Sequence, residues 1–291
     1  PIEESVLYER TSRILSGNVP LSHRKLSKEA MEKVIDDAIN ADFLIKKIPS
    51  TEYTATLVNR SVKKKMTVEL WELQDPWIGR FNFLLLIPKS MLKTPIIFGL
   101  SGHTEGARGF IENRFGDRFA AHGYTLALLE KRGFCGDVEG EQRLTKAMLL
   151  NGYSLLGIRL YEINVCLKFL QTLSTEPDYK LDTGRIGLIA HSGGCAEGNL
   201  LLRQGNPFKC YLYDSSRNFL PGEQKNGEPL FLEDSLPALW PFSETIRTTP
   251  FEIPAKMIPY DSFTESEIFG FFDPILKKKS LKEYFDEIFD D

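Results

Sequence analysis

Ser192 lies in the segment of the sequence that is best suited to chemistry. An apolar run, Ile186–Ala190, leads into the residues His-Ser-Gly-Gly, and a helix-like stretch follows. This order of strand, turn and helix is typical of a nucleophile elbow, in which small neighbours permit a strained turn that exposes the serine hydroxyl. The usual pattern is G-x-S-x-G, and Ala190 takes the place of its first glycine here. The alternative is a serine that only caps a helix while the glycines ease the turn.

A second loop could stabilise the negative charge that develops on a carbonyl oxygen when such a serine attacks it. The apolar run Ile96–Leu100 is followed by the glycine-bearing loop Ser101–Gly106. In a strand–turn–helix architecture this loop supplies one backbone N–H of an oxyanion hole, and the residue after the nucleophile supplies another. We therefore expect the donors to be the backbone N–H groups of Gly193, His103 and Thr104. The same glycines are also compatible with an ordinary turn between a strand and a helix.

The elements that must position these two loops alternate between strands and helices. The expected strands are Ile96–Leu100, Tyr124–Leu129, Ile186–Ala190 and Cys210–Tyr213. The expected helices are Ala107–His122, Leu155–Leu173 and Gly194–Arg203. Nearly continuous apolar strands that alternate with helices indicate a mostly parallel sheet with helices on both faces. The sequence therefore predicts an α/β fold.

The N-terminal part of the chain differs from this central pattern. Residues 1–50 are mostly polar with helical spacing, so we expect an N-terminal helical extension, and we expect residues 51–291 to form one domain. Three short β-rich runs open that domain, and the charged run Lys63–Lys65 is expected to form a hairpin turn between the first two. These runs are Tyr53–Val58, Met66–Leu73 and Phe81–Ile87.

The C-terminal part is expected to hold one more strand, Pro254–Asp261, and a helix-like stretch from Glu265 to Phe289 that Pro274 interrupts. Residues 220–249 lack a clear periodicity. They form either a lid, with Trp240 and Phe242 lining the site, or an ordinary surface excursion.

Composition excludes several classes of protein. The chain has 291 residues, 42% of them hydrophobic and 26% charged, and a formal net charge of −4. These values fit a soluble globular protein and argue against a nucleic-acid partner, because phosphate binding needs a cationic face. No apolar run approaches the roughly 20 residues of a membrane span. The four cysteines lack close CxxC spacing, which argues against a structural zinc site and against a thioredoxin-like motif. A cytoplasmic location and export with removal of a leader both fit.

Four pieces of the sequence resemble the α/β-hydrolase superfamily, and within it the dienelactone-hydrolase-like and acetyl-xylan-esterase-like group. The resemblance covers the range from Met66 to Tyr213 well. The pieces are Gly102-His103 after a strand, Lys131-Arg132-Gly133-Phe134 after the next strand, the helix from Leu155, and Arg185-Ile186-Gly187 leading to His191-Ser192-Gly193-Gly194.

The resemblance implies an α/β-hydrolase fold and a serine ester hydrolase that uses no cofactor and acts on a small-molecule ester. It implies Ser192 as the nucleophile, which would carry the acyl-enzyme. It also implies an acid on a loop after a later strand, for which Asp261 is the preferred candidate and Asp214 the second. Either aspartate could instead cap a helix or a turn.

The histidines depart from the pattern of that group, whose triad runs Ser, acid and His in chain order. No histidine follows Ser192. The side chain of His191 should diverge from that of its neighbour, His122 is expected to interact with a helix C-terminus, His103 is expected to serve the oxyanion loop, and His23 is expected at the surface. The domain is therefore expected either to lack its last strand and its histidine loop or to have lost its catalytic machinery.

Three functions fit these observations. The first is a serine carboxylic-ester hydrolase that acts on a small or carbohydrate-linked ester. The second is a catalytically inactive or truncated hydrolase-fold protein with a binding role. The third is a serine peptidase of the prolyl-oligopeptidase type, which shares a Ser-x-Gly-Gly elbow. The lack of a propeller-sized N-terminal region argues against the third.

Overall fold

The computed structural model describes a defined part of the chain. The described residues are 27, 29–30, 32–33, 52–103, 105–132, 138–150, 153–205, 207–214, 222–225, 228–230, 250–259 and 262–277. Most of the predicted N-terminal extension, residues 1–50, therefore lies outside the described residues, as do His23, Cys135, Trp240 and Phe242.

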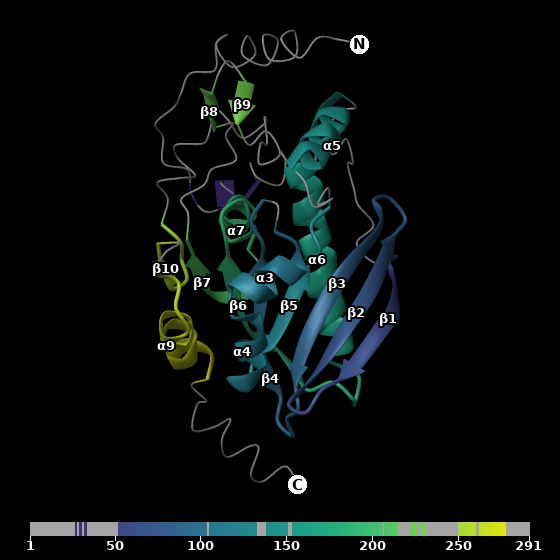
Figure 1. Cartoon of the computed structure of the whole chain (residues 1–291), viewed down its shortest axis with the longest axis vertical. Coiled ribbons are helices and arrows are strands. Elements are labelled where there is room, and N and C mark those ends of the chain that lie inside the picture. The colour runs from purple at the N-terminus through teal and green to yellow at the C-terminus, as the bar shows by residue number, and fades with distance from the viewer. Residues whose placement is uncertain are drawn as a thin grey trace.

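The central element is an eight-stranded sheet with the order β1-β2-β3-β5-β4-β6-β7-β10. The strands β1, β2, β3 and β5 pair antiparallel in succession, and from β5 onward β4, β6, β7 and β10 each pair parallel with the strand before them. The edge strands β1 and β10 lie on opposite sides of the molecule (Figure 1). The strands are β1 (Thr54–Val62), β2 (Met66–Asp75), β3 (Gly79–Pro88), β4 (Thr94–Leu100), β5 (Thr125–Leu129), β6 (Leu181–Ala190), β7 (Phe208–Tyr213) and β10 (Ala255–Met257).

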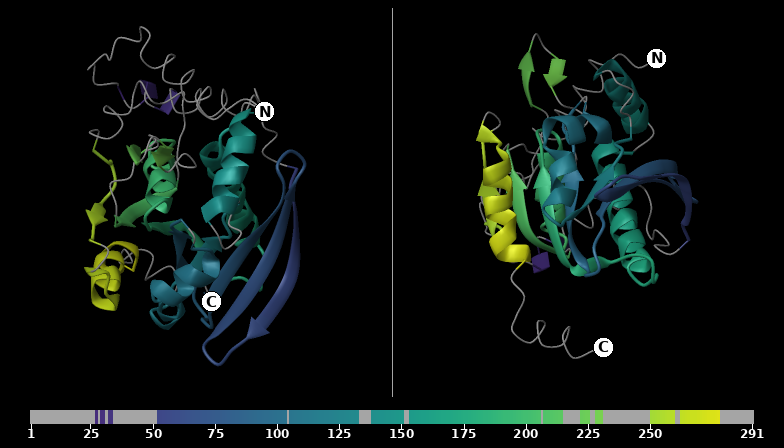
Figure 2. Two further views of the ribbon diagram at one scale, coloured as in Figure 1. Left: turned by 45° about the horizontal axis from the view of Figure 1, so that its top comes forward. Right: turned by 60° about the horizontal axis from the view of Figure 1, so that its bottom comes forward.

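Helices cover both faces of the parallel strands, as the sequence predicted. Alternate residues of one strand face opposite sides, so Ile96 and Phe98 of β4 join one apolar cluster and Ile97 joins the other. The first cluster includes α6 and α7, and the second includes α3, α4 and α9. Figure 2 shows α6 and α9 on opposite sides of the parallel strands. The helices are α3 (Ala107–Asn113), α4 (Gly116–Ala121), α5 (Val138–Leu150), α6 (Leu155–Leu173), α7 (Gly194–Leu201) and α9 (Glu265–Leu276).

The prediction of one helix over Ala107–His122 is wrong, because this segment forms the two short helices α3 and α4. Phe115 adopts a left-handed backbone conformation between them, with φ of 57°. The next residue, Gly116, packs so closely on α3 that a Cβ there would lie 2.6 Å from the Cα of Ile111. The tight turn is therefore fixed by packing that local helical periodicity does not report. His122 ends α4, as expected for a residue near a helix C-terminus, and stacks on Phe269 of α9.

Four further segments of the structure differ from what the sequence predicted or left open. The sequence did not predict α5, whose first turn contains Gly140 and several polar residues. Pro274 lies inside α9 and does not interrupt it before Leu276. The strand predicted over Pro254–Asp261 is shorter, and only Ala255–Met257 pairs with β7. The region from 220 to 249 contains a small hairpin of β8 (Gly222–Lys225) and β9 (Glu228–Leu230).

The remaining strand predictions agree with the structure to within four residues at their ends, except that β6 begins at Leu181 and not at Ile186. The lysine run Lys63–Lys65 forms the turn of the β1–β2 hairpin, where the N–H of Lys63 donates to the carbonyl of Met66 at 2.8 Å. The predicted Leu155–Leu173 helix coincides with α6. The hydroxyl of Ser154 accepts a hydrogen bond from the backbone N–H of Gly157 and thereby caps the start of this helix.

Candidate active site

Ser192 lies in the sharp turn between β6 and α7, at the carboxyl end of the central parallel strands. Its φ is +47°, a left-handed backbone conformation that a residue with a side chain adopts only at a cost in free energy. Gly194 permits this turn, because a Cβ there would lie 2.5 Å from the carbonyl oxygen of Leu100. The backbone therefore has the strained geometry that the elbow pattern predicts.

Asp214 directly follows β7 and holds the turn that contains Ser192. Its Oδ1 accepts a hydrogen bond from the backbone N–H of Ser192 at 2.8 Å, and its Oδ2 contacts Nδ1 of His191. The guanidinium of Arg114 lies 3.8 Å from the same carboxylate. Burial alone would raise the pKa of Asp214, but the hydrogen bonds from His191 and Ser192 and the charge of Arg114 lower it overall. Asp214 is therefore an ionised, buried carboxylate that holds the backbone of Ser192.

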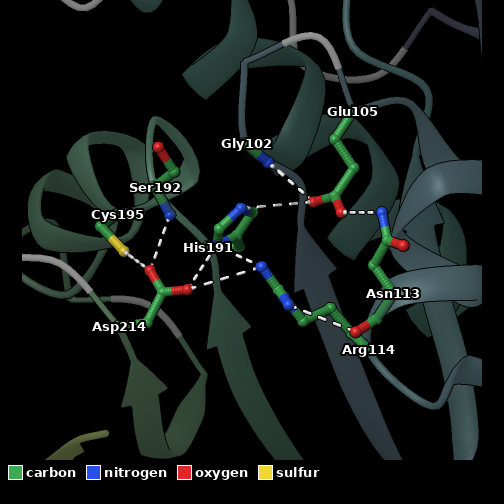
Figure 3. Close-up of polar contacts among 8 residues, drawn as sticks. All are labelled: Gly102, Glu105, Asn113, Arg114, His191, Ser192, Cys195 and Asp214. Carbon is green, nitrogen blue, oxygen red and sulfur yellow. Dashed lines mark hydrogen bonds and ion pairs between the residues drawn. The ribbon is translucent and has the colours of Figure 1, made fainter. Parts of the chain in front are cut away.

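His191 points away from the hydroxyl of Ser192, as Figure 3 shows. Its Nδ1 lies within hydrogen-bond distance of both Asp214 and Arg114, and the Arg114 Nη2 is 2.8 Å away. Its Nε2 lies 4.0 Å from Oε2 of Glu105. The same Oε2 accepts from the backbone N–H of Gly102 at 3.3 Å. The expectation that the His191 side chain diverges from its neighbour agrees with this geometry.

His103 lies on the other side of the elbow, at the end of β4. A Cβ on Gly193 would lie 2.5 Å from Nε2 of His103 and 2.8 Å from its Cε1, so the imidazole packs directly on the glycine that follows Ser192. The Nδ1 of His103 lies 3.5 Å from Oε2 of Glu141, a buried residue of α5. The second oxygen of Glu141 pairs with the buried guanidinium of Arg159.

The charge of Glu141 is stabilised in spite of its burial. Burial alone would raise the pKa of this carboxyl group, whereas His103 and the positive charges of Arg159 and Lys131 lower it to about 2. The same cations connect to α7, because Arg159 Nη1 lies 3.9 Å and Lys131 Nζ 3.0 Å from Oε1 of Glu197. A buried charge cluster of Lys131, Glu141, Arg159 and Glu197 thus joins the segment after β5 to α5, α6 and α7.

The structure brings together several of the residues that the sequence singled out. Ser192, Gly193 and His103 meet where β4 and β6 end, and Asp214 lies directly beneath them. Among the described residues, no acceptor is found for the backbone N–H of Gly193, whereas the N–H of Ser192 is bound to Asp214. Thr104 and Asp261 lie outside the described residues.

Sequence reasoning missed the charged residues that hold these loops, namely Glu105, Arg114, Glu141, Arg159 and Glu197. A signal was present, because charges within apolar helical stretches are buried only when they are paired. Arg159 and Glu162 interrupt the apolar run of α6, and both side chains are fully buried.

Other chemistry in the described part of the chain is limited. The free cysteines Cys166, Cys195 and Cys210 are buried, and burial raises the pKa of the Cys210 thiol to about 12. In the ranges that the structure describes, no group of three histidine, cysteine or acidic side chains is arranged to hold a metal ion. None of the described helices has both the length and the apolar character to cross a membrane.

Comparisons with known proteins define the fold. No protein-family model and no curated protein matches the sequence. A putative acetyl xylan esterase from Bacteroides fragilis NCTC 9343 is similar in structure, with a TM-score of 0.62 and 17% identity over 88% of this chain and 77% of that protein. A methylesterase is similar with a TM-score of 0.52 and 16% identity over 94% of this chain and 70% of that protein. Together with the mostly parallel sheet, these likenesses show that the chain has the α/β-hydrolase fold.

Proposed function

We propose that the chain is a serine carboxylic-ester hydrolase that acts on a small or carbohydrate-linked ester through an acyl-enzyme on Ser192. The observation that carries the proposal is the strained backbone of Ser192 beside the N–H of Gly193, for which no acceptor is found among the described residues. A backbone N–H next to a nucleophile can stabilise the oxyanion of a tetrahedral intermediate. The similarity to an acetyl xylan esterase and a methylesterase supports an ester as substrate.

In the proposed reaction the Ser192 hydroxyl oxygen forms a bond to the acyl carbon. The alcohol leaves with the proton of that hydroxyl, and water then releases the acid and restores the serine. The N–H groups of Gly193, His103 and Thr104 would bind the oxyanion, and Asp261 would orient the base. Asp214 has a different role in this proposal, because its oxygens already hold Ser192 and His191.

Among the described residues, no side chain is placed to act as the general base for Ser192. Within the described residues the Ser192 hydroxyl has no hydrogen bond to a histidine, and His191 is engaged with Asp214. This observation favours the second candidate function, a hydrolase-fold protein with a binding role. The two functions differ in whether a supplied base restores turnover.

Chemical rescue separates the two functions. Hydrolysis of p-nitrophenyl acetate would be measured with and without imidazole for the unmodified chain and for Ser192→Ala, which subtracts the reaction of imidazole itself. The hydrolase proposal predicts Ser192-dependent turnover that either occurs unaided or appears as imidazole is added, because imidazole supplies the general base. Equal rates for the two proteins at every imidazole concentration would favour the binding role.

A further inference from the structure

The side chain of His103 has a structural relation to the elbow that its backbone role does not explain. Its ring occupies the space that a Cβ of Gly193 would need, with the ring atoms 2.5 to 2.9 Å from that position. The imidazole is only 11% exposed. It therefore fills the gap between the end of β4 and the start of α7, the two elements that carry the proposed oxyanion donors.

Glu141 holds the opposite side of the same ring. Its Oε2 lies 3.5 Å from Nδ1 of His103, while Nε2 of the ring faces Gly193. The Glu141 side chain is 3% exposed, so a water molecule cannot easily replace either partner. A carboxylate in such a position fixes the orientation of an imidazole.

The buried charge cluster also connects Glu141 to α7. Arg159 contacts Glu141 and also donates to the backbone carbonyl of Arg132, from Nη2 at 2.7 Å and from Nε at 3.2 Å. Glu197, in the first turn of α7, lies 3.0 Å from Lys131. The same cluster thus anchors the helix that begins at the elbow and the residue that holds the His103 ring.

We propose that the imidazole of His103, held by Glu141, is a positioning residue that fixes the distance between the two oxyanion donors on the β4 loop and on Gly193. The proposal rests on the proposed ester hydrolysis and adds a role for the buried charges. Oxyanion donors act through preorganised geometry. A His103 ring that is held less firmly should therefore lower kcat more than it weakens substrate binding.

A double-mutant cycle tests whether Glu141 acts through His103. The variants are Glu141→Gln, His103→Ala and the two together, and kcat and KM are measured for each under the conditions in which the unmodified chain turns over. Each single change should lower kcat by roughly 10- to 100-fold, with KM changed by less than about threefold. The double variant should match His103→Ala alone, because Glu141 has no ring left to hold. Multiplying losses, an effect on KM alone, or an unchanged kcat would overturn the proposal.

Glu69→Gln is the matched control. Glu69 is also a buried glutamate paired with an arginine, since Arg60 Nε lies 2.8 Å from its Oε1, but it belongs to β2. This variant should lose stability as Glu141→Gln does, because both lose a buried carboxylate, and it should keep its kcat. A loss of kcat in Glu69→Gln equal to that in Glu141→Gln would assign both effects to lost stability and overturn the proposal.

Gly193→Ala tests the contact itself if Glu141→Gln does not fold. The added methyl group must displace the ring of His103, so kcat should fall in the unmodified background. In the His103→Ala background the same change should cost several-fold less, because the space is vacant. Equal losses in both backgrounds would show that the ring does not set the geometry.

Amide hydrogen exchange separates failure of this inference from failure of the proposed function. Exchange of the peptide over residues 101–106 should be faster in Glu141→Gln than in the unmodified chain, and unchanged in Glu69→Gln. This readout needs no turnover. If the chain shows no Ser192-dependent hydrolysis, the proposed function fails. If exchange of this peptide is unchanged in Glu141→Gln, the positioning role of His103 and Glu141 fails, whether or not the chain is a hydrolase.

Discussion

Two histidine–carboxylate pairs flank Ser192, and they differ in what they touch. In the pair of His191 and Asp214, the carboxylate accepts a hydrogen bond from the backbone N–H of Ser192. The pair of His103 and Glu141 lies on the side of the proposed oxyanion donors, where the ring packs on Gly193 and the carboxylate joins the buried charge cluster. A histidine beside an acid near a serine is therefore not enough to define a triad, because the atoms that the ring faces decide its role.

The largest expected effect is at the residue between the two pairs. Ser192→Ala and Ser192→Gly should both reduce the proposed hydrolysis to the uncatalysed level, because the nucleophile is lost. Only the glycine variant should also gain stability, by about 1 kcal/mol, because glycine adopts a φ of +47° without strain. Thermal unfolding of the two variants measures this difference. Equal stability would contradict a strained elbow.

The pair of His191 and Asp214 should respond mainly in stability. Asp214→Asn keeps an oxygen for the Ser192 N–H but removes the charge that faces the nearly buried Arg114. Breaking such a buried pair should lower the free energy of unfolding by about 3 kcal/mol, measured in urea.

Asp261→Asn should instead lower kcat with little change in stability, if Asp261 is the acid. A loss of kcat in Asp214→Asn together with an unchanged kcat in Asp261→Asn would instead identify Asp214 as the catalytic acid.

Acid should weaken the oxyanion-side pair. The pKa of Glu141 is about 2 in the folded chain and 4.5 as its ordinary value, so its contribution is fully present above pH 4.5 and is lost as the pH falls toward 2. The contribution is on the order of 3 kcal/mol. The stability difference between the unmodified chain and Glu141→Gln should therefore shrink over this range. A difference that stays constant from pH 5 to pH 2.5 would argue against a charged Glu141.

Among the three buried carboxylates, Glu162 should give the smallest change in stability, and its effect has the opposite sign. Burial raises its pKa to about 7 despite the Arg132 guanidinium at 2.6 Å, so ionisation in the folded chain costs stability as the pH rises from 4.5 through 7. Glu162→Gln should gain roughly 2 kcal/mol relative to the unmodified chain between pH 5 and pH 8. Denaturant unfolding of both proteins at pH 5 and at pH 8 measures this difference in the free energy of unfolding. A relative loss at pH 8 would show that Glu162 is stabilised as Glu141 is.

Much of the fold could be predicted because it is encoded locally. Apolar runs mark the parallel strands, Ser154 marks the start of α6, and small residues mark the turn at Ser192. The break at Phe115 could not be predicted, because the close packing of Gly116 on α3 imposes it. The prediction of one long helix there was wrong for that reason.

The candidate site was predictable only in its backbone. The turn and the oxyanion loop follow from residue types next to one another in the sequence. The charges that hold them are paired across long separations, since Lys131 meets Glu197 and Arg114 meets Asp214 only in the folded chain. Such pairs leave no local pattern. The signal that the sequence does hold is the pair of charged residues, Arg159 and Glu162, within the apolar run of α6.

Phosphonylation by a fluorophosphonate tests the central claim most directly, because it needs the nucleophile and the oxyanion donors but no complete turnover. The adduct would be located by mass spectrometry of peptides from the unmodified chain, Ser192→Ala and Glu141→Gln, with imidazole supplied as base. We predict one adduct on Ser192, none in Ser192→Ala and an at least tenfold slower reaction in Glu141→Gln. A folded, unmodified chain that forms no adduct on Ser192 would contradict the account.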